Sequence, residues 1–572
     1  MFKFFQKGQK LLTSPQNSVM SAAAVIMLMI VVSRILGLVR QRILAHFFVP
    51  TDLSLFFAAF RLPDLVFEVL VFGTFSSAFI PVFTRAIKDD EKKAWDTASY
   101  VVNIGILVFV VFGLLLGFGA PQMYGVLTPG FTAEDQAKIV SLTRVLFAAQ
   151  GFFVVSYVLT GVLESLRRFL IPALAPLFYN LGIIVGTVFL SKQFGLNGPV
   201  YGVVLGAFAH FAIQLPLAYK MGFRFKNKIL FTPEVRRIGK LALPRVIEVS
   251  FLQVSKMVEL FFSSLISKAA YTYFTFGNSL QLLPVGIFGT SIAKAALPSL
   301  ASYADDHENF KKVLFSALYD MAFFVIPIST LLIVLRVPIV RLVYGTDIFT
   351  WESTIQTGYV LSAFAIGVFF QSAAALLARS FYALHDTRTP VVISVLSIIL
   401  IVIFDYVFVS VFKTGVWGLA LSFTIGSFIQ SGSLFVMINK RVKNGKLTTA
   451  LIPIGKSVFS AFVSGSIMFI LLKFFDRYAW IKRLSFLGKI EIARNLPFEK
   501  FVLDTRYTIN LIILTFFVSL VGLLSYIVIS MFLKSQQVWN FFELVKRILR
   551  KNISPIPKEQ EPVSSTPTDA TS

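Results

Sequence analysis

Residues 33–85 read SRILGLVRQRILAHFFVPTDLSLFFAAFRLPDLVFEVLVFGTFSSAFIPVFTR and place charged side chains inside long apolar runs. The charged residues within the apolar pattern are Arg34, Arg40, Arg42, Arg61, Asp64 and Glu68. A charge in hydrocarbon costs about 2.5–3.5 kcal/mol on insertion scales, so such residues normally face a bundle interior or a watery cavity. This stretch therefore predicts a membrane protein that handles something anionic.

The composition of the 572-residue chain indicates a membrane as its solvent. Hydrophobic residues make up 56% of the sequence, charged residues 14%, and the mean hydropathy is +0.78. A net charge of +24 would suggest nucleic acid for a soluble protein. Here the positive residues lie in short loops between apolar runs, which is the positive-inside pattern of membrane proteins. We therefore expect no nucleic-acid partner.

Residue types that carry enzyme chemistry are scarce. The chain has no cysteine, which excludes disulfides and thiolate metal sites. Its four histidines form no i, i+3 or i, i+4 pair, and no phosphate loop of the GxxxxGK[ST] type is present. Without a nucleophile–base or metal constellation, the sequence predicts that the protein is not an enzyme.

We predict an all-α polytopic protein with about fourteen transmembrane helices, because apolar runs of roughly 20 residues recur along the chain. They lie near residues 19–45, 53–84, 96–120, 137–165, 170–191, 198–221, 242–266, 270–303, 311–335, 354–382, 390–412, 416–439, 450–474 and 507–533. Loops rich in Lys and Arg alternate with loops poor in both, which places both termini in the cytoplasm. The long basic loop 475–506 falls outside in this topology, and we interpret it as an amphipathic surface segment.

An internal repeat relates the two halves of the chain. The triplet Phe72-Gly73-Thr74 recurs as Phe288-Gly289-Thr290, so that the central glycine returns after 216 residues. The segment LESLRRFLIP (163–172) aligns with FYALHDTRTP (381–390) at an offset of 218 residues. Similar offsets at two separate places indicate a duplicated unit. We expect two pseudo-symmetric six-helix lobes around a central site, with two helices added at the C-terminus.

These features divide the chain into segments. They are a cytoplasmic lead-in (1–18), a first lobe (19–222), a cytoplasmic linker (223–241), a second lobe (242–445), two further helices (446–534) that flank the loop 475–506, and a basic helix with a disordered tail (535–572).

The chain resembles the MurJ/MviN lipid II flippases of the MOP exporter superfamily over about residues 19–445. The segments that carry the resemblance are SRILGLVRQRI (33–43), FRLPDLVFEVLVFGTFSSAFIPVF (60–83), GVLESLRRFLIPALAPLFYN (161–180), LPVGIFGTSIAKAALPSL (283–300) and FYALHDTRTP (381–390). The resemblance implies a multi-pass protein of the bacterial cytoplasmic (inner) membrane. It would move lipid II, the undecaprenyl-pyrophosphate-linked peptidoglycan precursor, by alternating access. The implied partners are lipid II and membrane lipids, and cell-wall synthases join them as candidates.

Arg34 and Arg40 match the two arginines of the family's SR-x-x-G-x-x-R motif, and the resemblance implies that they bind substrate. Six residues apart, they lie about 120° apart round a helix with a rise of about 9 Å, so both fit one broad cavity wall. The arginine fork suits pyrophosphate because it donates two hydrogen bonds at once. The alternative is that each arginine snorkels to the membrane surface from near a helix end. The family's acidic residue that follows the second arginine is Gln41 here.

Some arginines of the family's cavity are missing from this chain. Their positions are held by Phe67, Glu68 and Ser279. Lys256 and Lys294 are candidates to supply replacement charge for the substrate, since lysine acts on phosphate as a point charge. For Lys256 the alternative is an ion pair with Glu259, three residues along the same helix.

Arg61 is a further candidate for substrate binding. It either faces the cavity or joins the two lobes through an ion pair with Asp64 or Glu68. Asp52 resembles the Asp of the family's TD motif. We therefore assign Asp52, Asp64 and Glu68 to lobe pairing.

Glu259, Asp405 and Thr424 fall where the family places a sodium site. Their oxygen atoms suit a hard cation, and the resemblance implies coupling to sodium or a proton with no other cofactor. The family's Asn four residues before Asp405 is Ile401 here. A buried carboxylate paired with Lys256 explains the same residues without a cation.

Two rival functions stay open at the level of sequence. A MOP-type flippase for another lipid-linked glycan would also bind pyrophosphate. A non-transporting membrane scaffold could keep the fold, and it would tolerate neutral residues at Arg34 and Arg40.

Overall fold

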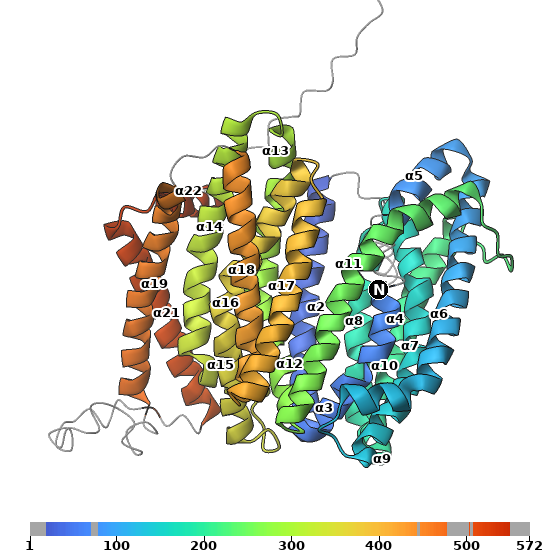
Figure 1. Ribbon diagram of the computed structural model, residues 1–572, viewed down its shortest axis with the longest axis horizontal. Helices are drawn as coiled ribbons and strands as arrows, with labels where there is room; N and C mark the ends of the chain where they lie inside the picture. The colour runs from blue at the N-terminus through green and yellow to red at the C-terminus, as the bar shows by residue number, and fades with distance from the viewer. Residues whose placement is uncertain (1–18, 70–77, 443–446, 477–502, 504–506, 550–572) are drawn as a thin grey trace, which may run out of the picture.

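The computed structural model describes residues 19–69, 78–442, 447–476, 503 and 507–549. Over these residues the chain is a bundle of long helices without a strand (Figure 1). Twelve of the helices are long and apolar enough to cross a membrane. This confirms the all-α polytopic fold, whereas the total of fourteen spans stays a prediction.

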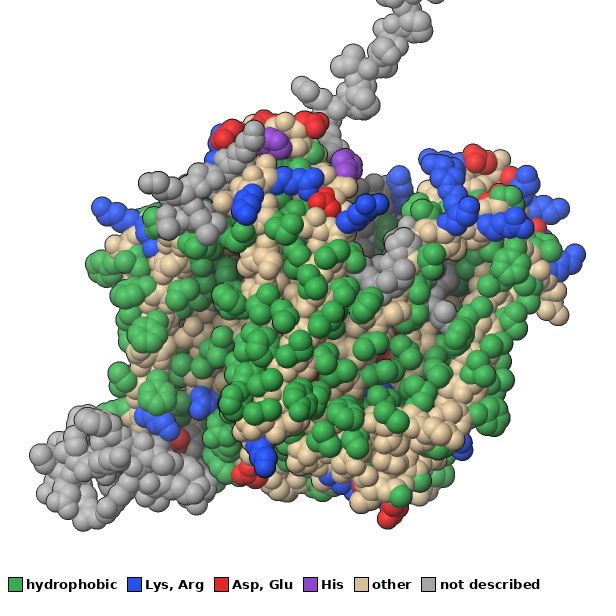
Figure 2. Space-filling view, in the orientation of Figure 1, with side chains coloured by type: hydrophobic (Ala, Val, Ile, Leu, Met, Phe, Trp, Pro, Cys, Tyr) green, Lys and Arg blue, Asp and Glu red, His purple; other side chains and the backbone are tan. Residues whose placement is uncertain are grey.

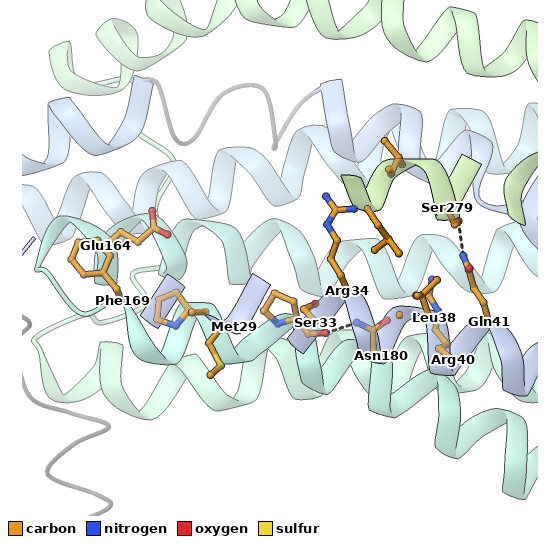
Figure 3. Close-up of a pocket in the computed structure, with 16 residues that line it drawn as sticks. Met29, Ser33, Arg34, Leu38, Arg40, Gln41, Glu164, Phe169, Asn180 and Ser279 are labelled. Carbon is orange, nitrogen blue, oxygen red and sulfur yellow. Dashed lines mark hydrogen bonds between the residues drawn. The ribbon is translucent and has the colours of Figure 1, made fainter. Parts of the chain in front are cut away.

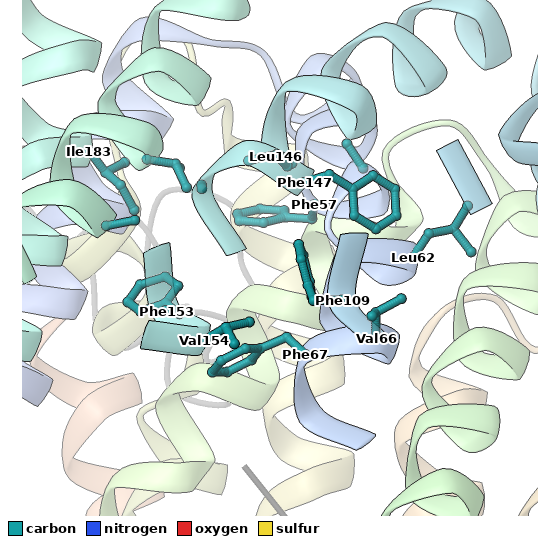
Figure 4. Packing of buried hydrophobic residues seen from close by; sticks show 14 of the residues in the cluster. Phe57, Leu62, Val66, Phe67, Phe109, Leu146, Phe147, Phe153, Val154 and Ile183 are labelled. Carbon is teal, nitrogen blue, oxygen red and sulfur yellow. The ribbon is translucent and has the colours of Figure 1, made fainter. Parts of the chain in front are cut away.

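The first half of the chain folds from α2 to α10. Its elements are α2 (Val19–Phe47), α3 (Pro50–Ala59), α4 (Arg61–Phe67), α5 (Ile80–Asp89), α6 (Glu91–Leu127), α7 (Ala133–Ser165), α8 (Leu170–Val185), the π-helical turn η3 (Gly186–Leu190), α9 (Ser191–Phe194) and α10 (Asn197–Lys220). Phenylalanines fill the core of this half, and Figure 4 shows Phe67, Phe109 and Phe153 among them.

The second half contains the corresponding helices and an addition. Its elements are α11 (Pro233–Ile266), α12 (Ala270–Pro284), the π-helical turn η4 (Val285–Thr290), α13 (Ser291–Ser302), α14 (His307–Val334), α15 (Arg336–Tyr344), α16 (Trp351–Ala383), α17 (Arg388–Tyr406), the π-helical turn η5 (Val407–Val411) and α18 (Trp417–Arg441). After these come α19 (Leu447–Phe475), α21 (Thr508–Phe532) and α22 (Gln536–Leu549). The helices α19 and α21 pack together at the outer edge of the second half, on α14 (Figure 1).

The second predicted span, 53–84, is not one helix. It is divided into α3, α4 and α5, and residues 70–77 lie outside the described part. Pro63 explains the first break, because a proline has no N–H to donate to the carbonyl four residues earlier. That carbonyl, of Ala59, instead accepts a hydrogen bond from the Thr143 hydroxyl on α7 at 2.9 Å. The broken segment is thereby tied to its neighbour helix.

The seventh span begins earlier than predicted. α11 starts at Pro233, inside the segment 223–241 that we had expected to be a linker. The Thr232 side chain accepts a hydrogen bond from the Val235 N–H, and proline is favoured in the first turn of a helix. α11 packs on α4, α5 and α6 of the first half and on α12 and α17 of the second, so it connects the two halves.

The predicted repeat is visible in the turns that join equivalent helices. Arg167, between α7 and α8, and His385, between α16 and α17, have φ angles of 58° and 59°. Each turn is closed by a matching backbone bond, from Arg168 N to Leu163 O at 2.8 Å and from Asp386 N to Phe381 O at 2.9 Å. These pairs keep the 218-residue offset.

Some predictions fall on parts of the chain that are not described. The lead-in 1–18, the triplet Phe72-Gly73-Thr74, most of the loop 475–506 and the tail beyond residue 549 lie outside the described residues. The basic helix predicted after residue 535 is present as α22.

Candidate functional site

A cavity of about 700 Å³ lies between α2 and α8 of the first half and α12 of the second (Figure 3). At one end it is lined by Glu164 and Phe169, beside the turn that joins α7 to α8. At the other end it reaches Gln41 and Ser279. The cavity therefore runs from one face of the bundle into its interior.

Arg34 and Arg40 both line this cavity, and both project from α2 (Figure 3). Arg34 is exposed, and its guanidinium lies beside Gly286 in η4, where a Cβ would be 3.4 Å from it. The Nε of Arg40 is buried and has no hydrogen-bond partner among the described residues. Neither arginine forms an ion pair within the described ranges. The guanidinium groups of two arginines on one wall of the cavity are thus available to bind an anion.

Gln41 closes the inner end of the cavity through neutral hydrogen bonds. Its amide nitrogen donates to the Ser279 hydroxyl on α12 at 2.8 Å, and its amide oxygen accepts from the Tyr344 hydroxyl on α15 at 2.8 Å. The Tyr344 ring also stacks on Phe276, with ring centroids 4.1 Å apart. Gln41 and Ser279 are both uncharged, so this contact between the halves is neutral.

We call the contacts of Gln41 with Ser279 and Tyr344 the Gln41 seal. Further contacts between the halves lie beyond it. Thr346 donates to the Ala45 carbonyl at 2.9 Å, next to the C-terminal end of α2. The Ser54 and Thr272 hydroxyls are 2.9 Å apart, and Thr272 donates to the Pro50 carbonyl at 2.6 Å. The halves are joined at this end of the bundle by polar contacts from α2 and α3 to α12 and the residues after α15.

Arg61 and Asp64 pair with each other on α4. The Nη2 of Arg61 lies 3.5 Å from one carboxylate oxygen of Asp64, and the other oxygen accepts a 2.7 Å hydrogen bond from Gln150 on α7. The Arg61 guanidinium also lies over the Tyr271 ring, 6.0 Å from its centroid. Arg61 does not line the cavity, and both polar partners of Asp64 are in the first half.

Glu68 and Lys256 join the two predicted lobes. Lys256 Nζ on α11 lies 3.1 Å from a Glu68 carboxylate oxygen, and Gln253 also donates to that carboxylate. The structure thus gives Lys256 a partner from a distant part of the sequence, and no ion pair between Lys256 and Glu259 within 4 Å is found among the described residues. Lys256 is not among the residues that line the cavity.

Two predicted site residues have no such partners. Asp52 lies in the first turn of α3 and forms no ion pair among the described residues. Lys294 is exposed on α13 and is not part of the cavity lining. The structure therefore does not bring Lys294 together with Arg34 and Arg40.

Only some of the positions at the candidate cation site carry a side-chain oxygen atom that could act as a ligand. Asp405 is 1% exposed, and both of its carboxylate oxygens are without a hydrogen-bond partner in the described part of the chain. The Thr424 hydroxyl donates to the Ala363 carbonyl at 2.7 Å and keeps its lone pairs. No cluster of three or more His, Asp or Glu side chains that could hold a metal occurs within the described residues. Asp405 and Thr424 could accept a cation, whereas Ile401 supplies no oxygen atom.

Sequence reasoning found the arginines of the cavity but missed the partners of the seal. The position of Gln41 was noted only as a departure from the family. Nothing in the sequence around Tyr344 marks it, because α15 is a short helix inside a loop between two spans. The contact between Tyr344 and Gln41 becomes visible only in the three-dimensional structure.

The family model for the lipid II flippase MurJ matches residues 43–488. A lipid II flippase MurJ from Burkholderia cenocepacia is 28% identical over 433 residues, which cover 72% of this chain and 81% of the relative. A probable lipid II flippase MurJ from Buchnera aphidicola is 27% identical over 439 residues, covering 74% and 83%.

Solved structures show the same fold. A lipid II flippase MurJ in an inward closed conformation aligns with a TM-score of 0.70 at 24% identity, covering 89% of this chain and 98% of that one. An inward-facing MATE-family multidrug transporter of the MOP superfamily aligns with a TM-score of 0.62 at 15% identity, covering 72% and 94%.

Proposed function

This chain belongs to the MurJ family of lipid II flippases, and we propose that it moves lipid II across the bacterial cytoplasmic membrane. The observation that carries the proposal is the pair of cavity arginines without anionic partners on α2. A pyrophosphate has the charge and the oxygen geometry to accept hydrogen bonds from both. The protein would change the position of its substrate and none of its covalent bonds.

We infer that the cavity faces the cytoplasm in this conformation. In Figure 2, Lys and Arg side chains gather at the upper end of the molecule, where the turns between α5 and α6 and between α16 and α17 lie. By the positive-inside rule this end is cytoplasmic. The turn between α7 and α8, beside the mouth of the cavity, belongs to the same end, and the Gln41 seal belongs to the opposite one.

Transport then follows from a change in which contacts join the halves. Lipid II would place its pyrophosphate against Arg34 and Arg40 from the cytoplasmic side. To release it on the other side, the Gln41 contacts to Ser279 and Tyr344 must separate while the cytoplasmic ends of the halves approach. The ion pairs Glu68–Lys256 and Asp135–Lys268 are charged contacts between the halves that this rearrangement would change.

The coupling ion would bind near Asp405. A cation or a proton would satisfy its carboxylate oxygens, and the Thr424 hydroxyl would contribute a further oxygen. Glu259 would complete the acidic environment from α11.

Depletion rescue tests the proposal. A host depleted of its essential lipid II flippase is given this chain or its Arg34→Ala or Arg40→Ala variant. We expect the parent to restore growth and each variant to fail at equal membrane abundance. Arg236→Ala, which removes one exposed positive charge from the cytoplasmic start of α11, is the matched control and should support growth.

The outcomes separate the alternatives. Growth with both variants would refute the arginine mechanism and favour a scaffold. Failure of a correctly inserted parent to sustain growth would favour a flippase for a different lipid-linked glycan.

A further inference from the structure

Arg144 is an exposed arginine within the span α7. It lies eleven residues after the start of the helix, which corresponds to about 16 Å along the axis. The neighbouring surface of α6 is apolar and exposed, with Leu114 at 56% and Phe118 at 78%. No ion pair to Arg144 is found in the described part of the chain. A positive charge on an apolar surface is stabilised by an anionic partner, and no carboxylate of the described residues supplies one to Arg144.

Pro121 explains how the Arg144 side chain is held. A proline inside α6 has no N–H for the carbonyl four residues earlier, which belongs to Gly117. Arg144 Nε donates to that carbonyl at 3.2 Å. Arginine has five N–H donors, so this bond fixes the plane of the guanidinium and leaves four donors on its two terminal nitrogens.

The fixed guanidinium stands between two hollows of different character. The first, of about 320 Å³, is an apolar groove between α6 and α7 that is lined by residues including Phe109, Gly113, Gly117, Phe118 and Phe147. From Phe109 to Gly117 the groove follows α6 for about 12 Å. Gly113 faces the Phe147 ring across the groove, and a Cβ there would be in van der Waals contact with the ring at 3.5 Å, so a larger side chain would occupy the groove.

The second hollow, of about 560 Å³, lies on the other side of Arg144, towards the turn that joins α6 to α7. Its lining includes the polar side chains of Gln136 and Ser141. Along the membrane normal the order is therefore an apolar groove, a cation with free donors and a more polar hollow near the helix ends.

We propose that this surface binds an anionic phospholipid of the bilayer. One acyl chain would lie in the groove beside Phe109 and Gly113, the phosphate would accept hydrogen bonds from Arg144, and the head group would occupy the hollow at Gln136. Charge-assisted bonds from an arginine fork to phosphate are strong and directional. The site shares no lining residue with the cavity between the halves.

Lipid titration followed by native mass spectrometry of the full chain in detergent tests the proposal. The probe is dioleoylphosphatidylglycerol, and dioleoylphosphatidylcholine is the zwitterionic comparison. We expect the parent to bind the first phosphatidylglycerol more tightly than phosphatidylcholine. Arg144→Gln should weaken this binding about tenfold, the loss of a charge-assisted hydrogen bond. Gly113→Leu, which fills the groove, should weaken it as well.

Two controls separate lipid binding from structure. Lys192→Gln removes an exposed positive charge from α9 of the same half and should leave the affinity unchanged. Pro121→Ala restores a backbone N–H that can donate to the Gly117 carbonyl. In this background the carbonyl no longer needs a hydrogen bond from Arg144. If Arg144 binds the lipid, Arg144→Gln still weakens binding in the Pro121→Ala background.

Three results would overturn the proposal. The first is an equal effect of Arg144→Gln and Lys192→Gln. The second is recovery of lipid affinity when Pro121→Ala is added to Arg144→Gln. The third is that undecaprenyl phosphate displaces bound phosphatidylglycerol at a lower concentration than added phosphatidylglycerol does. That result would assign the groove to a lipid-linked substrate.

Discussion

Replacement of Gln41 by alanine should shift the protein towards opening of the sealed end. The substitution removes the bonds from Gln41 to Ser279 and to Tyr344, each 2.8 Å long. A neutral hydrogen bond contributes about 0.5–1.5 kcal/mol net, so the two together contribute about 1–3 kcal/mol to the sealed state. If both bonds break on opening, the ratio of sealed to open molecules falls by a factor of about 5 to 150.

A distance measurement across the seal detects this shift. The chain has no cysteine, so the pair His46→Cys and Asp347→Cys can be spin-labelled without further changes. Both positions are exposed, and they flank the bond between Thr346 and Ala45 that joins the halves. Double electron–electron resonance on the full chain in lipid nanodiscs should give one short distance for the parent. Gln41→Ala should add a longer population.

Gln430→Ala is the matched control for this experiment. Gln430 donates from its amide nitrogen to the Ser394 hydroxyl at 2.9 Å, and both residues lie in the second half. Its loss should leave the distances unchanged. The reasoning is refuted if Gln41→Ala gives the same distance distribution as the parent, since the two bonds would then add nothing to the seal.

Three further predictions follow from contacts described above. In a double-mutant cycle on thermal unfolding, Glu68→Gln and Lys256→Met should show a coupling of about 1 kcal/mol, because the pair is partly exposed; strict additivity of the two changes would contradict it. Thr143→Val should lower the free energy of unfolding by about 1 kcal/mol, measured by denaturant titration, because the carbonyl freed by the proline in α4 loses its 2.9 Å partner; an unchanged midpoint would argue against this bond. Hydrogen bonds, first of all from the Thr389 N–H, hold the pKa of Asp386 below its usual value. Its contribution to stability is therefore present above the unfolded pKa and lost as pH falls through the folded one, so Asp386→Asn should flatten the fall in melting temperature on acidification, and an equally steep fall would refute it.

Local patterns in the sequence predicted the repeat and the cationic wall. The segments around Arg167 and His385 align by residue type, and both residues adopt the same left-handed turn. Arg34 and Arg40 lie in one helix at a fixed spacing, so helix geometry alone places them on related faces. Predictions of this kind succeed because they depend on neighbours in the chain.

Predictions that depended on the choice of a distant partner succeeded less well. The i, i+3 rule suggested Glu259 for Lys256, but the carboxylate of Glu68, 188 residues away, is the partner in the structure. Tyr344 illustrates the same limit, since its hydroxyl meets Gln41 across 303 residues. The division of the span 53–84 combines both cases, because Pro63 marks the break and only the fold supplies Thr143 to stabilise it.

The neutral character of the Gln41 seal has an electrical consequence. Moving one elementary charge through a membrane potential of 100 mV changes the free energy by about 2.3 kcal/mol. An amide, a serine and a tyrosine carry no net charge, so their separation does no work against the field. A voltage-dependent step in transport would therefore have to move other charges, such as the arginines of α2 with their anionic cargo.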